Sequence, residues 1–191
     1  GEMLGRATGT LRLLLFAPLL GPEGFGALRM AFTSSSILAS FSGLGLHSAQ
    51  LRYLPEAKTP GAARMFLRRA LLWSLAGSAL VAALVLARPE SWASWIFSDA
   101  RYSLMVLVIA FSLPVVNFYK TVTGAGKGLG RFRAAAIAES LQNLFYLLLG
   151  VAVILCIARS AELVFFTYLV AMSAGAFWLL RSRKGLRTAA V

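Results

Sequence analysis

The sequence predicts an all-α integral membrane protein built as a bundle of six transmembrane helices. The chain is 59% hydrophobic and 14% charged, with a mean hydropathy of +0.75, whereas soluble domains carry about 25% charged residues. Six apolar segments approach the roughly 20 residues that a helix needs to cross a bilayer core of about 30 Å. Thirteen of the nineteen Lys and Arg residues gather in three clusters that follow every second segment. Together these features predict a multi-pass helical bundle.

The six predicted spans cover residues 3–20, 25–50, 70–87, 103–123, 134–158 and 162–180. Residues typical of turns separate them: a Gly-Pro turn at 21–24, a loop at 55–61, a break at Arg88-Pro89, a glycine-rich link at 124–130 and a hairpin at 159–162. Trp92 and Trp95 in the third link are typical of an aromatic belt at the membrane interface, on a short surface helix.

The basic clusters predict the orientation of the bundle. They comprise Arg52, Lys58, Arg64, Arg68 and Arg69 after span two; Lys120, Lys127, Arg131 and Arg133 after span four; and Arg181, Arg183, Lys184 and Arg187 in the tail. Loops rich in Lys and Arg stay in the cytoplasm, so both chain ends are expected there. Basic residues beside apolar spans indicate topology rather than nucleic-acid binding. A single cysteine, Cys156, and a single histidine, His47, build no metal site, so we expect no cofactor.

Arginines inside the predicted spans are the first candidates for a binding site. Arg12 lies eight residues before the end of span one, about 12 Å inside the outer boundary, and Arg6 lies about 9 Å deeper. An arginine at the centre of a span costs about 2.5–3.5 kcal/mol, which favours a functional role. A guanidinium fork suits a lipid diphosphate, and snorkelling to the interface is the alternative. Arg29 lies in the outer half of span two. It is expected either at the membrane interface or at the entrance of a transport cavity.

Other polar residues recur along the spans. Ser36 and Ser40 belong to a stripe of small polar residues in span two, which predicts close helix packing or a hydrated cavity. Asn117 lies in span four, and Glu139 and Asn143 lie in span five; all three are candidates for coupling or gating. Glu139 is a candidate for proton or cation coupling, or forms a salt bridge to Arg131, Arg133 or Lys120.

Three short runs resemble those of a known family: residues 20–26 (LGPEGFG), 52–57 (RYLPEA) and 128–133 (GLGRFR). They are similar to the polysaccharide and O-antigen flippases, of the multidrug, oligosaccharidyl-lipid and polysaccharide flippase superfamily. The resemblance implies a MATE-like transporter with two lobes. Residues 1–191 would be the amino-terminal lobe, with the carboxyl-terminal lobe absent from this chain.

The resemblance also implies a function, the flipping of a lipid-linked oligosaccharide across the bacterial inner membrane by alternating access. The expected partners are a polyprenyl diphosphate oligosaccharide and membrane lipid. Arg6 and Arg12 match the spacing of two first-helix arginines in the related lipid II flippase, and we add Arg52 to the candidates for coupling or gating. Two alternatives stay open: a MATE-type drug or metabolite antiporter, and a membrane-embedded transferase or polymerase acting on the same lipid. The spans show no catalytic acid–base pair, so we expect no enzymatic activity.

Overall fold

The computed structural model describes residues 2–57 and 59–181, apart from the side chains of residues 2–9, 13 and 60, and contains no strand in these ranges. The described elements are α1 (Glu2–Ser42), α2 (Leu46–Tyr53), α3 (Pro60–Ala87), α4 (Pro89–Phe97), the 3-10 helix η1 (Ala100–Tyr102), α5 (Ser103–Gly128), α6 (Phe132–Cys156) and α7 (Ala161–Arg181). The predicted all-α class is confirmed.

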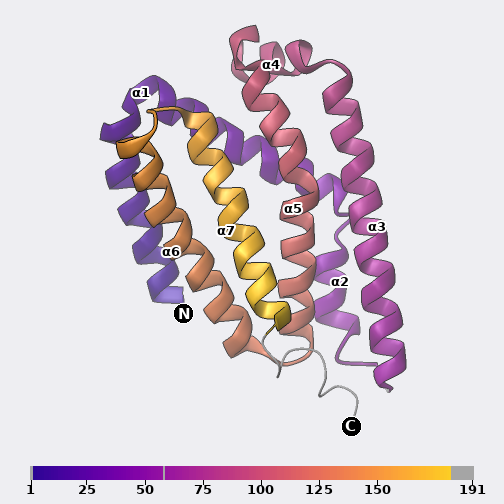
Figure 1. Ribbon diagram of the computed structural model, residues 1–191. Helices are drawn as coiled ribbons and strands as arrows, with labels where there is room; N and C mark the ends of the chain where they lie inside the picture. The colour runs from indigo at the N-terminus through magenta and orange to yellow at the C-terminus, as the bar shows by residue number, and fades with distance from the viewer. Residues whose placement is uncertain (1, 58, 182–191) are drawn as a thin grey trace.

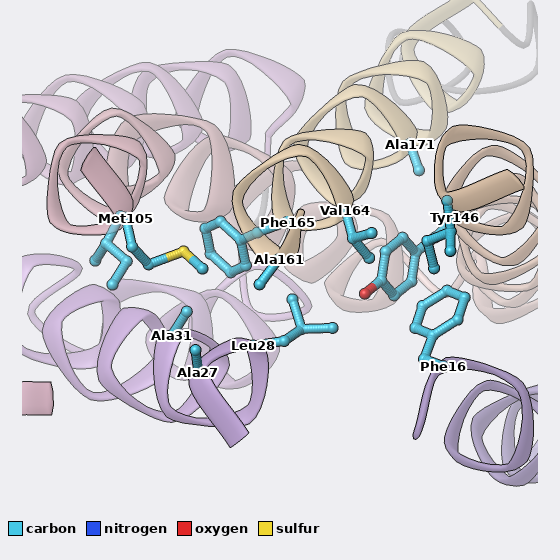
Figure 2. Close-up of a cluster of buried hydrophobic side chains, with 12 residues drawn as sticks. Phe16, Ala27, Leu28, Ala31, Met105, Tyr146, Ala161, Val164, Phe165 and Ala171 are labelled. Atoms are coloured by element: carbon cyan, nitrogen blue, oxygen red, sulfur yellow. The ribbon is translucent and has the colours of Figure 1, made fainter. Parts of the chain in front are cut away.

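Helix α5 lies in the middle of the bundle and packs against α1, α2, α3 and α7 (Figure 1). Its residues Met105, Ile109 and Leu113 are fully buried. One hydrophobic cluster joins α5 to α1, α6 and α7. Figure 2 shows part of this cluster, with Phe16 of α1 beside Tyr146 of α6. The core is therefore formed between helices that are far apart in the sequence.

Four helical stretches within the described residues are long and apolar enough to cross a membrane. They are Gly61–Ala87, Ala100–Gly128, Phe132–Cys156 and Ala161–Arg181. Large apolar side chains also point away from the bundle, among them Leu80 at 65% and Phe177 at 61% exposure. Soluble proteins rarely expose apolar surface on this scale. The chain is therefore a multi-pass membrane protein.

The first predicted span and most of the second lie in α1. This helix is interrupted at Gly21, whose φ of 72° and ψ of 171° are not helical, and Pro22 then occupies a position suited to the first turn of a new segment. The predicted span 25–50 is not continuous, because Leu44 (φ 51°) and Gly45 (φ 65°) adopt left-handed conformations. The chain turns there and resumes as α2.

The prediction of a glycine-rich link at residues 124–130 is wrong for its first five residues. Helix α5 continues to Gly128, because its glycines form the surface on which α2 packs. A Cβ atom on Gly124 would lie 2.8 Å from the side-chain Oε1 of Gln50, and one on Gly128 would lie 2.6 Å from the backbone oxygen of Gln50. The glycines at 124 and 128 are therefore contact residues, and the link is reduced to residues 129–131.

Helix α3 begins ten residues before the predicted start of span three at residue 70. Thr59 caps it, since its side-chain oxygen accepts a hydrogen bond from the N–H of Ala62 at 3.3 Å. Arg64, Arg68 and Arg69 consequently lie on α3 rather than in a loop. The short helix predicted around Trp92 and Trp95 is present as α4.

The links divide between the two ends of the bundle (Figure 1). The α2–α3 link, the α5–α6 link and the end of α7 lie at one end. The bend of α1, helix α4 and the α6–α7 link lie at the other end. The described basic residues Arg52, Arg131 and Arg181 belong to the ends of α2, the α5–α6 link and the end of α7, and therefore lie toward the first of these two ends.

An exposed polar cluster joins the bend of α1 to η1. The Arg101 guanidinium donates from Nε to Asp99 Oδ2 at 2.6 Å and from Nη2 to Glu23 Oε1 at 3.1 Å. The hydrogen bond from the Arg101 backbone N–H, followed by the bond from its side chain, lowers the pKa of Asp99. Because these groups are exposed, the ion pairs contribute little to stability.

Candidate functional site

A pocket of about 560 Å³ opens between the two arms of α1 and the helices α6 and α7. Arg12 enters it from the arm before Gly21, and Arg29 enters it from the arm after Gly21. Gln142 and Asn143 of α6 add two side-chain amides. The pocket thus combines two cations with groups that both donate and accept hydrogen bonds.

Arg12 lies over an aromatic wall. Its Cζ atom is 5.1 Å from the ring centroid of Tyr146, a cation–π distance. The ring of Tyr146 meets those of Phe16 at 5.6 Å and Tyr168 at 5.3 Å, in edge-on geometry. Phe32 of the second arm completes the wall, 4.8 Å from Tyr168. These rings hold the arms of α1 against α6 and α7 and fix the surface beneath the Arg12 guanidinium.

A glycine of α6 permits this close approach of the first arm. A Cβ atom on Gly150 would lie only 2.5 Å from Cζ of the Phe16 ring. Phe16 is 2% exposed and Tyr146 is 2% exposed, so the two rings are sealed into the core. The Tyr146 hydroxyl oxygen is also buried, without a hydrogen-bond partner among the described residues. The base of the pocket therefore carries one unsatisfied polar atom.

The electrostatics of this pocket favour an anion. Arg12 is half-buried and Arg29 is exposed, and no acidic side chain lines the pocket among those that the structure describes. Arginine binds phosphate oxygens through a planar, bidentate fork. A phosphate-bearing group with a polar attachment is the ligand class that this chemistry suits.

Ser40 and Asn117 lie in a different pocket, of about 200 Å³, where α1 ends against α3 and α5. The Asn117 side chain donates from Nδ2 to Ser42 Oγ and to Ser78 Oγ, both at 2.8 Å. Ser36 lies on the exposed side of α1, where its backbone oxygen accepts a bond from Ser40 Oγ at 2.8 Å. The structure thus brings Arg12, Arg29 and Asn143 together and places Ser36, Ser40 and Asn117 elsewhere.

Glu139 and Arg52 do not line the arginine pocket. Glu139 forms an ion pair with Lys127, with 2.6 Å between Oε1 and Nζ, a partner that the sequence interpretation did not include. Arg52 is exposed on α2, with its Cζ atom 5.6 Å from the Tyr53 ring centroid. Arg6 lies in α1, but its side chain is outside the described part of the structure.

The sequence interpretation did not include the aromatic residues of the pocket. Tyr146 and Tyr168 fall well inside predicted spans five and six, whereas tyrosines in membrane proteins concentrate at the interfaces. Two tyrosines at this depth could have indicated a binding site from the sequence alone. Their pairing with Arg12 depends on the path of α1, which no local pattern specifies.

A comparison with known protein families identifies the family of this chain. The family model of the polysaccharide biosynthesis proteins matches residues 1–189. The chain belongs to this family. Neither a curated protein sequence nor a solved structure gives a significant match. Membership in the polysaccharide biosynthesis family confirms the resemblance drawn from residues 20–26 and 52–57. Together with the membrane-spanning helices, it fits a transporter of the flippase type.

Proposed function

We propose that this protein flips a lipid-linked oligosaccharide across the bacterial inner membrane by alternating access, without enzymatic activity. The observation that supports this proposal is the pocket that Arg12 and Arg29 both line, with no acidic side chain among its described lining residues. A lipid diphosphate offers oxygens that two guanidinium groups can share. Gln142 and Asn143 offer amides to sugar hydroxyls on the same pocket wall.

The proposal includes six spans, with both chain ends in the cytoplasm, arranged as one lobe of a MATE-like transporter. The two arms of α1 would supply the first two spans in addition to the four apolar stretches. The described basic residues of the α2–α3 link, the α5–α6 link and the end of α7, at one end of the bundle (Figure 1), support this orientation. A prenyl chain would remain in lipid while the diphosphate and sugar pass through the polar pocket.

The alternative functions receive less support from the pocket. A MATE-type antiporter of cationic drugs would be expected to attract its substrate with carboxylates, and the described lining offers arginines instead. A transferase or polymerase needs an acid or base beside the reacting group, and no described carboxylate lines the arginine pocket.

We further propose that any proton or cation coupling through Glu139 requires its ion pair with Lys127 to open, since that pair occupies the carboxylate. Asn143 is the coupling candidate that lies beside the arginines. Asn117 and Arg52 would act from outside the pocket, by gating rather than by substrate contact.

The decisive experiment replaces Arg12 in the native host and measures surface polysaccharide and protein abundance. Arg12→Ala should abolish surface polysaccharide at unchanged abundance. Arg12→Lys should restore it only in part, because a point charge does not reproduce the bidentate fork. Arg29→Ala should have a milder effect, since Arg29 is exposed at the pocket mouth.

Arg64→Ala is the matched control, because Arg64 is exposed on α3 and does not line the pocket. It removes the same charge and should leave export unchanged. Normal export by Arg12→Leu would contradict the proposal, since a snorkelling arginine tolerates this change and a diphosphate ligand does not.

A further inference from the structure

A second cationic pocket lies at the turn between α1 and α2 and shares no lining residue with the arginine pocket. Its volume of about 200 Å³ is below the roughly 300 Å³ at which pockets usually begin to hold drug-sized ligands. It therefore suits a small group rather than an oligosaccharide. Lys120 of α5 and His47 of α2 both line it.

Lys120 is a half-buried cation within a predicted membrane span. It lies eight residues before the end of α5 at Gly128, which corresponds to about 12 Å along the helix axis. That depth is too great for the lysine stem simply to carry its ammonium group out past the helix end. Among the described residues Lys120 forms no ion pair, in contrast to Lys127, which is bonded to Glu139. A buried charge is costly without a partner, so an anionic ligand would stabilise this site.

The donors around Lys120 suit phosphate oxygens. The Lys120 ammonium offers three N–H groups. Thr121 and Ser48 also line the pocket; their hydroxyl oxygens lie 3.4 Å from Ser74 Oγ and 3.2 Å from His47 Nδ1, and either hydroxyl could turn from that partner to a phosphate oxygen. Asn117 is not free to donate, because both of its amide hydrogens bond to Ser42 and Ser78. It acts instead as a tie between α1, α3 and α5 that fixes the pocket wall. No acidic side chain lines this pocket among those described.

We propose that the Lys120 pocket is a second anion site, which binds a phosphate or diphosphate group through Lys120, with His47 and the neighbouring hydroxyls as further partners. Arg29 of the first pocket and Ser40 of the second are eleven residues apart on one arm of α1, about 16 Å along its axis. Ser40 lies farther from the bend at Gly21 than Arg29 does, so a diphosphate entering from the end opposite the bend would meet the Lys120 pocket before Arg29. This order of contact rests on the proposed function, whereas anion binding at Lys120 does not.

The test is lysine footprinting of the purified protein in detergent, in an Arg12→Gln background that disables the first pocket. An amine-reactive acetylating reagent is applied with and without inorganic diphosphate, and each lysine is quantified by mass spectrometry. At about ten times the dissociation constant, roughly one tenth of the sites remain free, so modification of Lys120 should slow about tenfold. Lys127 is the internal control and should be modified at an unchanged rate.

Further versions of the footprinting experiment identify the molecule that supplies the phosphate. Polyprenyl diphosphate in mixed micelles and phosphatidylglycerol are tested in the same way. Protection of Lys120 by inorganic diphosphate or by polyprenyl diphosphate supports the site, and stronger protection by the lipid assigns it to a lipid-linked substrate. Lys120→Gln should weaken diphosphate binding at least about tenfold by calorimetry, the equivalent of roughly 1.4 kcal/mol, while Lys120→Arg retains it.

Three results would overturn the inference: modification of Lys120 unaffected by both diphosphates, equal protection of Lys120 and Lys127, or protection by phosphatidylglycerol alone. Because Arg12 is already replaced in this assay, these results are independent of the export test. If Arg12 proved not to bind a diphosphate, protection of Lys120 from acetylation would still be expected.

Discussion

Asn117 joins three helices that are distant in the sequence through side-chain hydrogen bonds, and replacing it tests how the bundle is held together. Its side chain is 3% exposed and donates two hydrogen bonds of 2.8 Å, one to Ser42 of α1 and one to Ser78 of α3. Asn117→Leu preserves approximate volume and removes both bonds. Ser42 and Ser78 keep their own bonds to the backbone oxygens of Ala39 and Ser74, so neither hydroxyl is left without a partner.

The magnitude follows from measured bonds between membrane helices, which average about 0.6 kcal/mol and reach about 1.7 kcal/mol. Two bonds give an expected loss of about 1 kcal/mol from the average and about 3 kcal/mol at most. The assay is reversible unfolding in mixed detergent micelles, followed by circular dichroism, for Asn117→Leu, Ser78→Ala and the double variant. The coupling energy between positions 117 and 78 should be about 0.6 kcal/mol or more.

Thr121→Val is the matched control in the same helix. Thr121 Oγ1 lies 3.4 Å from Ser74 Oγ, longer than the roughly 2.5–3.0 Å of a good hydroxyl hydrogen bond. Its replacement should cost less than the average bond of about 0.6 kcal/mol. Strictly additive effects at positions 117 and 78, within about 0.3 kcal/mol, would refute the reasoning.

Three further predictions follow from the described geometry. Gly21→Ala should destabilise the protein by about 1–3 kcal/mol in the same unfolding assay, because only glycine adopts its backbone angles readily, whereas Gly26→Ala, in an open helical position, should be neutral or stabilising. In a Cys156→Ser background, which is needed because Cys156 is exposed, single cysteines at positions 23, 90 and 160 should be labelled from outside intact cells, and those at positions 59 and 130 should not; outside labelling at 59 or 130 would reverse the topology. The lowered pKa of Asp99 means that its stabilising contribution is present above its unfolded pKa of about 3.9 and is lost as the pH falls through the folded value. The difference in melting temperature between the wild-type protein and Asp99→Asn should therefore shrink between about pH 6 and about pH 3, and a difference that stays constant would exclude this contribution.

Composition and charge were sufficient to predict the class of this protein. Apolar length specifies helices in a membrane because every backbone group must find its partner within the segment. That rule predicted spans three to six to within a few residues, except at the start of α3 and the end of α5. Both exceptions extend beyond the apolar stretch: α3 because Thr59 and Pro60 begin a helix earlier, and α5 because its glycines pack against α2.

The candidate site was only partly predictable, because its residues meet through tertiary packing. The cost of a charge in a membrane singled out Arg12 from its depth alone. The position of Arg29 in the same pocket follows from the bend at Gly21, and the aromatic wall of Tyr146 and Tyr168 follows from the packing of α6 and α7. The polar stripe of span two suggested one shared face. The turn at Leu44 and Gly45 instead ends that face, and the rest of the predicted span forms a separate helix, α2, against α5.

Gly21 connects the sequence pattern to the pocket. Arg12 is nine residues before it and Arg29 is eight residues after it, so each lies about 12–14 Å along its own arm from the same bend. An uninterrupted helix would separate the two side chains by about 25 Å along one axis, too far for one phosphate group to contact both. Folding back at Gly21 returns the second arm toward the first, and both arginines then line one pocket. The angle between the arms therefore sets the distance between the two cations. A transporter that changes this angle during alternating access would tighten or release a bound diphosphate without moving either arginine along its helix.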